Sequence, residues 1–227
     1  IQIYNHIITE QREAGERKVD PKKIEYLCTV PKKINSLAER NNYSVYQTNS
    51  IDPRVYLIGL KIQQKSIKDI CSLVSEFAKN KIFQEFNLLS EGYTGEAILF
   101  CNLHKPLYQQ LDKVYQKNNL KPEGNDSFQL SSKQYQSLQQ LKSILPSIKN
   151  PPKENSPEQE EKIKELTKRS MQLLIRREEE CFIPHIHEHL RDHSKVIYLL
   201  EEWHIFSPVL RNKLIEKGIS YASYIQG

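Results

Sequence analysis

The sequence predicts an α/β fold with a mixed, mostly parallel central sheet, flanking helices and a helical insert. A strand-helix-strand pattern appears twice, over residues 54–86 and 195–225, and the stretch between them is mainly helical in its periodicity. Parallel strands joined by crossover helices bring their carboxyl ends to one edge, and open α/β sheets bind ligands there. The residues that follow these strands are therefore where we expect a site.

The length of 227 residues fits one large domain or two small ones, and 38% hydrophobic residues are enough for a core. We expect a single domain over residues 1–227. Its expected parts run in chain order: N-terminal helices and a strand (1–50), a first βαβ half (51–103), a helical insert (104–191) and a second βαβ half (192–227).

The elements of the first half follow local signals. Residues 1–28 show a polar helical pattern, a second helix runs from Pro31 to Arg40, and residues 43–46 form a short strand. The apolar run 55–58 is a strand ending at Gly59. Ser66 caps the crossover helix, and residues 82–86 form the returning strand, with Glu85 at its carboxyl end.

Helices dominate the insert. Apolar spacing predicts helices over residues 106–117 and 131–145, and Ser156-Pro157 begins a third that Pro184 kinks or restarts. Residues 97–103 fit a helical turn and a buried strand equally well. The second half has a strand over 196–200, a helix from Ser207-Pro208 to Gly218, and a final strand over 219–225.

Charge and cysteine usage narrow the class of protein. The net charge of +5 comes from mixed basic and acidic residues with no concentrated basic run, so we do not expect a nucleic-acid partner. The cysteines are far apart, as in a reduced intracellular protein. No apolar run is long enough for a membrane span and no signal peptide is visible. We predict a cytoplasmic protein, with a secreted effector as the alternative, because the chain begins at Ile1 and its N-terminus fits a trimmed one.

Two segments at the expected edge carry polar candidates. After the first strand, Gly59 permits a sharp turn or a close ligand approach, and Lys61 offers a cation to an anion. Glu85 ends the second strand of that unit, where burial of a carboxylate is costly without a partner or a role.

The turn after the strand 196–200 is the other polar segment. His204 fits a general base, Trp203 covers the apolar edge, and Glu201 adds a carboxylate. Arg177 on the long helix is a further candidate for the same edge.

His185, His189 and His193 share a helix face at the i, i+4, i+8 spacing that can chelate a metal. Metal sites usually draw ligands from more than one element, and no carboxylate lies on this stripe. We therefore interpret it as a solvent-facing helix and predict no metal ligands and no cofactor, with a divalent metal as the alternative.

Taken together, these segments resemble the TraB/Tiki and haem-binding ChaN/erythromycin-esterase-like superfamily. The likeness covers residues 54–92 and 171–225, about half of the chain. That layout has a strand ending in a Gly-x-x-His turn, a strand ending in glutamate, an arginine-bearing helix and a second Gly-x-x-His turn. Here Gly59, Glu85, Arg177 and His204 match it, whereas Ile62 replaces the first histidine and Glu201 the second glycine.

We consider three functional hypotheses, of which the first two follow from the resemblance and the third from the helical stretch and the composition. The first is a catalytically lapsed binding protein that holds a protein partner or small ligand at the edge of Glu85 and His204. The second is a hydrolase in which His204 activates water, Glu85 orients it, and Lys61 or Arg177 assists, with or without a metal. The third is a helical interaction module, host-directed in an intracellular bacterium. The sequence predicts no oligomeric state.

Overall fold

A five-stranded sheet forms the centre of the computed structural model, which describes residues 32–50, 52–61, 64–95, 97–98, 105–144, 156–191 and 195–227. The predicted helix over 1–28 and His193 lie outside these ranges. The strands are β1 (Tyr43–Thr48), β2 (Val55–Leu60), β3 (Phe86–Ser90), β7 (Lys195–Glu201) and β8 (Tyr221–Gln226).

The strand order β1-β8-β2-β7-β3 confirms the predicted sheet. β8, β2, β7 and β3 are parallel neighbours, and β1 pairs antiparallel with β8 at one side. β2 of the first βαβ unit therefore lies between β8 and β7 of the second. Segments more than a hundred residues apart share one edge, as the predicted site requires.

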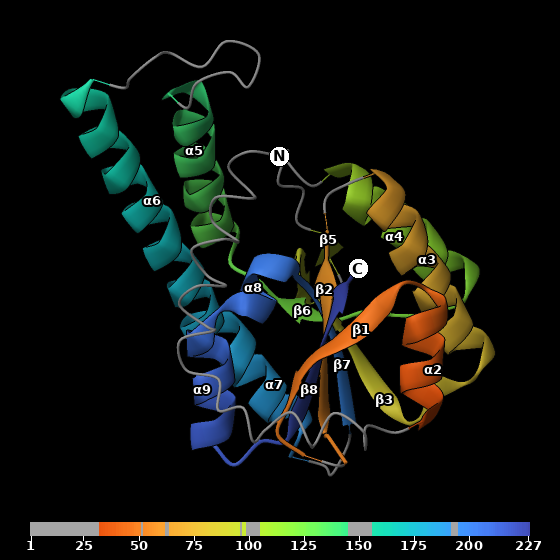
Figure 1. Cartoon of the computed structure of the whole chain (residues 1–227). Helices are drawn as coiled ribbons and strands as arrows, with labels where there is room; N and C mark the ends of the chain where they lie inside the picture. Colours follow the sequence, from red (N-terminus) through yellow and green to blue (C-terminus); the bar gives the residue numbers. More distant parts are fainter. Residues whose placement is uncertain are drawn as a thin grey trace.

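Both faces of the sheet are covered, so its central strands are apolar throughout. All six residues of β2 are buried, and they alternate between two cores. Tyr56 and Ile58 face α2 (Lys32–Arg40), α3 (Gln64–Lys79) and α4 (Lys105–Lys117). Val55 and Leu57 face α7 (Ile183–His189) and α9 (Pro208–Glu216). Figure 1 shows these two helical layers on either side of the sheet.

Two long helices, α5 (Phe128–Ile144) and α6 (Pro157–Arg177), lie side by side and extend beyond the sheet (Figure 1). Ser156 caps α6 as predicted: its hydroxyl accepts from the Gln159 N–H, and the Gln159 side chain accepts from the Ser156 N–H. The base of this hairpin lies next to α8 (Glu202–Phe206) and a small sheet of β5 (Ala97–Ile98), β4 (Tyr93–Gly95) and β6 (Gly124–Asn125).

Three local predictions were wrong. Residues 82–84 form a 3-10 turn, because Lys81 adopts a left-handed backbone conformation (φ 60°), and the strand begins only at Phe86. Gly59 lies within β2 rather than in a turn after it. The expected polar turn at Glu201–His204 is instead the last residue of β7 followed directly by the buried helix α8.

The helix around Pro184 continues without a break. α6 passes through a π-helical turn, Glu178–Phe182, directly into α7. Pro184 falls where the π turn passes into α7, so the sequence-based expectation of a restart at this residue was wrong.

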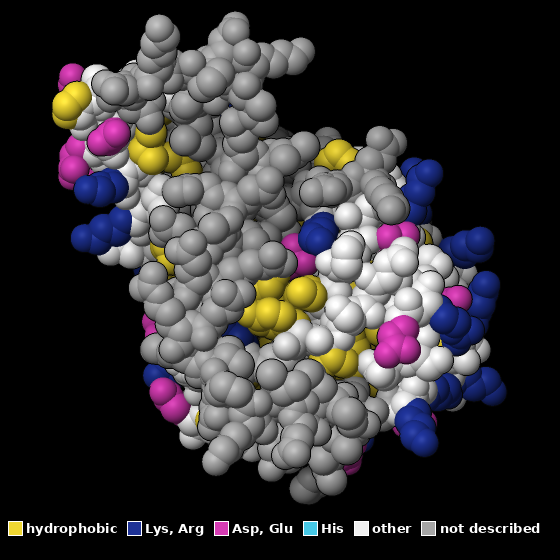
Figure 2. Space-filling view, in the orientation of Figure 1, with side chains coloured by type: hydrophobic (Ala, Val, Ile, Leu, Met, Phe, Trp, Pro, Cys, Tyr) yellow, Lys and Arg dark blue, Asp and Glu magenta, His cyan; other side chains and the backbone are white. Residues whose placement is uncertain are grey.

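The outer side of α2, α3 and α4 is rich in basic side chains, visible at the right of Figure 2. Its exposed lysines are Lys32, Lys33, Lys68, Lys79, Lys81, Lys113 and Lys117. Glu39, Asp69, Glu76 and Asp112 lie on the same helices, so the charge is mixed. Within the part of the chain that is described, no helix combines the length and apolar character needed to cross a membrane.

Candidate functional site

A buried network of charged side chains occupies the carboxyl edge of β3 and β7. Glu91 directly follows β3, Glu201 ends β7, and His204 lies on the short helix α8 that follows. Arg177 and Glu178 enter from the end of α6, and Asp126 from the segment before α5. All six side chains are almost completely buried.

Arg177 is the centre of one half of this network. Its guanidinium donates to Glu91 Oε1 at 2.5 Å, to Asp126 Oδ2 at 2.6 Å and to Gln134 Oε1 at 2.7 Å. A further bond from Nε reaches Asp126 Oδ1 at 3.1 Å. One arginine thus joins the sheet edge, the start of the insert and α5, in the geometry for which its planar group is suited.

His204 is the centre of the other half. Its Nδ1 lies 2.8 Å from Glu178 Oε1, and its Nε2 lies 3.4 Å from Glu91 Oε1. The Ser207 hydroxyl donates to the second oxygen of Glu178 at 2.7 Å. The backbone N–H of Glu201 donates to Glu91 Oε2 at 2.6 Å, which fixes Glu91 at the start of α8. His204 is therefore held between two carboxylates.

The network shifts the pKa of its members in opposite directions. Burial alone would raise the pKa of Glu91, but Arg177, His204 and the Glu201 N–H outweigh it and lower that pKa to about 2. Burial would lower the pKa of His204, yet the carboxylates of Glu91 and Glu178 raise it to about 9. Glu91 is thus ionised and His204 is an imidazolium at neutral pH.

Glu201 is shifted toward its neutral form. Burial, and then the neighbouring charge of Glu91, raise its pKa well above the usual range. The Tyr108 hydroxyl donates to Glu201 Oε1 at 3.2 Å. Burial likewise raises the pKa of Glu178.

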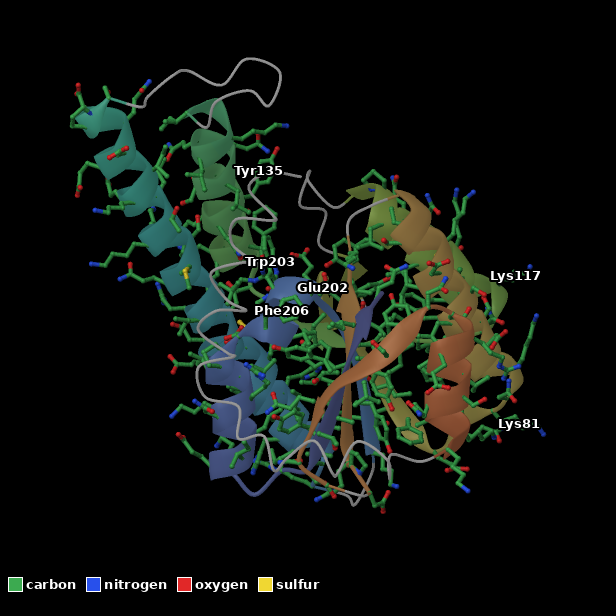
Figure 3. All side chains as sticks on the ribbon, in the orientation of Figure 1. Lys81, Lys117, Tyr135, Glu202, Trp203 and Phe206 are labelled. Carbon is green, nitrogen blue, oxygen red and sulfur yellow. The ribbon has the colours of Figure 1, made fainter. Side chains whose placement is uncertain are left out.

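A small cavity adjoins the network at the base of the hairpin. Its volume is about 30 Å³, close to that of a single water molecule. The residues that line it are Gly92, Tyr108, Asp126, Ser131, Gln134, Tyr135, Leu138, Arg177, Glu201 and Trp203. Figure 3 shows Trp203 and Phe206 on α8, between the hairpin and the sheet. Both pack with Leu138 of α5 and Leu174 of α6.

The structure brings together only some of the predicted residues. Arg177, Glu201, Trp203 and His204 meet at the carboxyl edge. Glu85 does not join them, because it precedes β3 and is exposed at the amino edge of the sheet. The expected proximity of Glu85 and His204 is therefore absent, and Glu91 occupies the position that was assigned to Glu85.

Gly59 and Lys61 lie next to Glu202 at the start of α8. A side chain at Gly59 would meet Glu202 Cγ and the Tyr224 carbonyl at 3.2 Å, so the glycine permits close packing. Lys61 donates to the Gln226 carbonyl at 2.6 Å and lies 3.7 Å from Glu202. Both residues therefore pack or pair with the protein itself.

Four residues of the network, Glu91, Asp126, Gln134 and Glu178, were not predicted from the sequence. Glu91 had a signal, because Glu91-Gly92 ends the apolar run 88–89 and a glycine with positive φ often follows a strand at a ligand edge. Asp126 and Gln134 had no sequence signal, because their partner Arg177 is distant in the sequence. Glu178 had none because it lies within a run of charged residues.

Residues of metal-ligating type lie together elsewhere among the described residues, and since His185 is buried, the interpretation of its helix face as solvent-facing was wrong. Glu123, His185 and His189 place one ligand atom each within 4.8 Å of one another. This group is separate from the charged network, whose carboxylates already contact Arg177 and His204.

Comparison with known proteins gives no guide to the class of this chain. No protein-family profile, no curated protein and no solved structure matches it. The site must therefore be interpreted from its own geometry.

Proposed function

We propose that this chain is a binding protein without hydrolytic activity, on a diverged form of the TraB/Tiki and ChaN/erythromycin-esterase-like fold. The order of its elements supports the kinship: β2 with Gly59, a crossover helix, β3 followed by Glu91, α6 with Arg177, then β7 and α8 with His204. In this proposal Glu91 replaces Glu85 as the glutamate of that layout.

The observation that carries the proposal is the environment of His204. A general base needs a ring nitrogen with a free lone pair near the proton that it removes. Both nitrogens of His204 face carboxylates at 2.8 and 3.4 Å, and the side chain has no solvent exposure. With its pKa raised to about 9 by these carboxylates, against the effect of burial, the ring holds two protons at neutral pH. It cannot accept one from water.

Among the described residues, Ser207 has the hydroxyl nearest to the pair of His204 and Glu178, and its geometry does not suit a nucleophile. The Ser207 hydroxyl donates to Glu178 rather than to His204, so the serine has no base to activate it. The adjoining cavity of about 30 Å³ has room for a water molecule but not for an ester or a peptide.

The network has a structural use that fits a binding protein. Arg177 ties the end of α6 to the sheet edge and to α5, and so fixes the base of the α5–α6 hairpin. Residues 157–165 of α6 are almost entirely exposed, with acidic residues at the start of the helix. We assign partner binding to this firmly anchored hairpin.

A hydrolase is the second candidate, because Glu91, Arg177 and His204 do converge at the edge where α/β enzymes place their chemistry. The deciding experiment measures hydrolysis of p-nitrophenyl acetate and of casein, without metal and with Zn²⁺ or Mn²⁺. We expect equal rates for wild type, His204→Gln and a buffer blank. A wild-type rate well above the blank that disappears in His204→Gln would overturn the proposal.

Binding by the hairpin has its own test. Glu158, Glu160 and Glu161 are replaced together by lysine, and a control replaces the exposed Lys79 and Lys81 of the α3 side by glutamate. We expect a specific partner captured by wild type and by the control but lost from the hairpin variant. An unchanged set of captured proteins in all three would contradict the assignment to the hairpin.

A further inference from the structure

The residues Glu123, His185 and His189 form a three-member group outside the charged network. One ligand atom from each lies within 4.8 Å of the other two. The histidines are four residues apart on α7, and the glutamate comes from the segment before β6. The fold thus adds the carboxylate from a second element that the histidine stripe lacked in sequence.

The backbone holds this arrangement in place. The Ser90 N–H donates to the Glu123 carbonyl at 2.8 Å, and the Glu123 N–H donates to the Leu88 carbonyl at 3.0 Å. Glu123 is therefore bridged to the edge strand β3, next to Leu89. On the other side, the rings of His185 and His189 meet edge to face with centroids 4.6 Å apart. The three side chains are preorganised by a strand edge and a helix.

His185 gives independent evidence for a bound group. Its side chain is only 9% exposed, and its Nε2 has no hydrogen-bond partner among the described residues. A buried polar atom without a partner is costly, and native proteins usually satisfy it. Its other ring nitrogen, Nδ1, lies 3.9 Å from the exposed Glu188 carboxylate, which is too far for a hydrogen bond.

The distances between the ligand atoms and the exposure of the side chains suit a metal ion with one coordination position open to water. His189 Nε2 and Glu123 Oε2 lie 3.3 Å apart, close to the separation of about 3.4 Å between two ligands of one tetrahedral ion with bonds of about 2.1 Å. The Glu123 side chain is 49% exposed and that of His189 is 18% exposed, so an ion can enter and keep a water ligand. Two imidazoles and one carboxylate are a ligand set typical of Zn²⁺.

We propose that Glu123, His185 and His189 bind a divalent transition-metal ion of the Zn²⁺ type, with water completing its coordination. The site joins α7 to the segment before β6, at the side of β3. It is independent of the proposed binding function of the hairpin.

The experiment is a calorimetric titration of ZnCl2 into the metal-stripped, tag-free full chain, with MgCl2 as a comparison ion. The variants Glu123→Gln and His189→Ala each remove one partly exposed ligand. His187→Ala is the matched control, because His187 lies on the same helix but is exposed and outside the group. Far-UV circular dichroism checks that every variant is folded.

We expect one Zn²⁺ per chain, no binding of Mg²⁺, and a thermal midpoint that rises with Zn²⁺ concentration. Each ligand variant should lose at least about 10- to 100-fold in affinity, since even outer partners of metal ligands cost that much, and His187→Ala should bind as wild type does. Absence of Zn²⁺ binding would overturn the proposal. Equal affinity in all four proteins, or a loss in His187→Ala as large as in the ligand variants, would also overturn it.

Discussion

Replacement of Arg177 by methionine tests whether the buried network anchors the hairpin. The change keeps much of the side-chain volume but removes the donors to Glu91, Asp126 and Gln134. Removing one partner of a buried ion pair costs about 3–5 kcal/mol, because the remaining charge is left uncompensated. Two carboxylates lose their partner here, so we expect a loss of about 4 kcal/mol in the free energy of unfolding. For a chain of this size that corresponds to a thermal midpoint about 8–16 °C lower.

The adjacent Arg176 provides the control. It contacts Glu180 through two hydrogen bonds on the exposed side of the same helix, and we expect no measurable loss in Arg176→Met. Urea denaturation followed by circular dichroism measures both variants, and the Arg177→Met/Asp126→Asn double variant completes a mutant cycle. Its loss should be smaller than the sum of the single losses, whereas the exposed pair Arg176→Met and Glu180→Gln should show a much weaker coupling. An Arg177→Met protein as stable as Arg176→Met would refute the reasoning.

Three further predictions concern protonation and backbone packing. The pKa of His204 rises from 6.5 to about 9 on folding. Its stabilising contribution to the free energy of unfolding is therefore complete below pH 6.5 and disappears as the pH rises through 9. The free energy of unfolding should fall by about 3 kcal/mol over that window in wild type relative to His204→Gln, and parallel pH curves would contradict the charge assigned to the ring. The raised pKa of Glu201 means that folding keeps a proton which the unfolded chain releases above pH 4.5. Glu201→Gln should therefore gain stability relative to wild type at pH 7 but not at pH 4, and a constant difference in urea midpoints would exclude a protonated Glu201. A side chain at Gly124 would lie 2.5 Å from the Tyr93 carbonyl oxygen, whereas Gly218 faces open space with φ +67°. Gly124→Ala should lose about 3 kcal/mol and Gly218→Ala about 1 kcal/mol, and the reverse order in denaturation would show that the β4–β6 contact is loose.

Much of the fold was predictable because its signals are local. The apolar runs of β2 and β7, the Ser156 and Ser207 helix starts and the Gly218 helix end all appear in the structure near their expected positions. β3 was misplaced by about four residues because both 82–86 and 86–90 contain apolar side chains. The left-handed Lys81 that separates turn from strand has no sequence signal, since lysine rarely adopts that conformation.

The sequence predicted which edge of the sheet carries the candidate site, but it did not predict most of the contacts that form the site. Arg177 and His204 were placed at the carboxyl edge and do lie there, 3.4 Å or less from Glu91. Glu91 and Arg177 are 86 positions apart, so their contact depends on how α6 packs against the sheet edge, which local sequence patterns do not reveal. Glu178 was hidden in the run Arg176–Glu180, where charges four apart usually pair on the surface, as Arg176 and Glu180 do.

The π-helical turn Glu178–Phe182 has a consequence for both clusters. An ordinary α-helix advances by about 100° per residue, so side chains four apart drift gradually around its axis. The wider turn offsets this drift, and Arg177, Glu178, Cys181, Phe182, His185 and Ile186 all remain buried along one flank. If the same residues formed a regular α-helix, eight steps of about 100° would turn His185 by about 80° relative to Arg177 and carry it away from Glu123. The one extra residue of the π turn therefore sets the orientation of His185 and His189 relative to the ion pairs of Arg177.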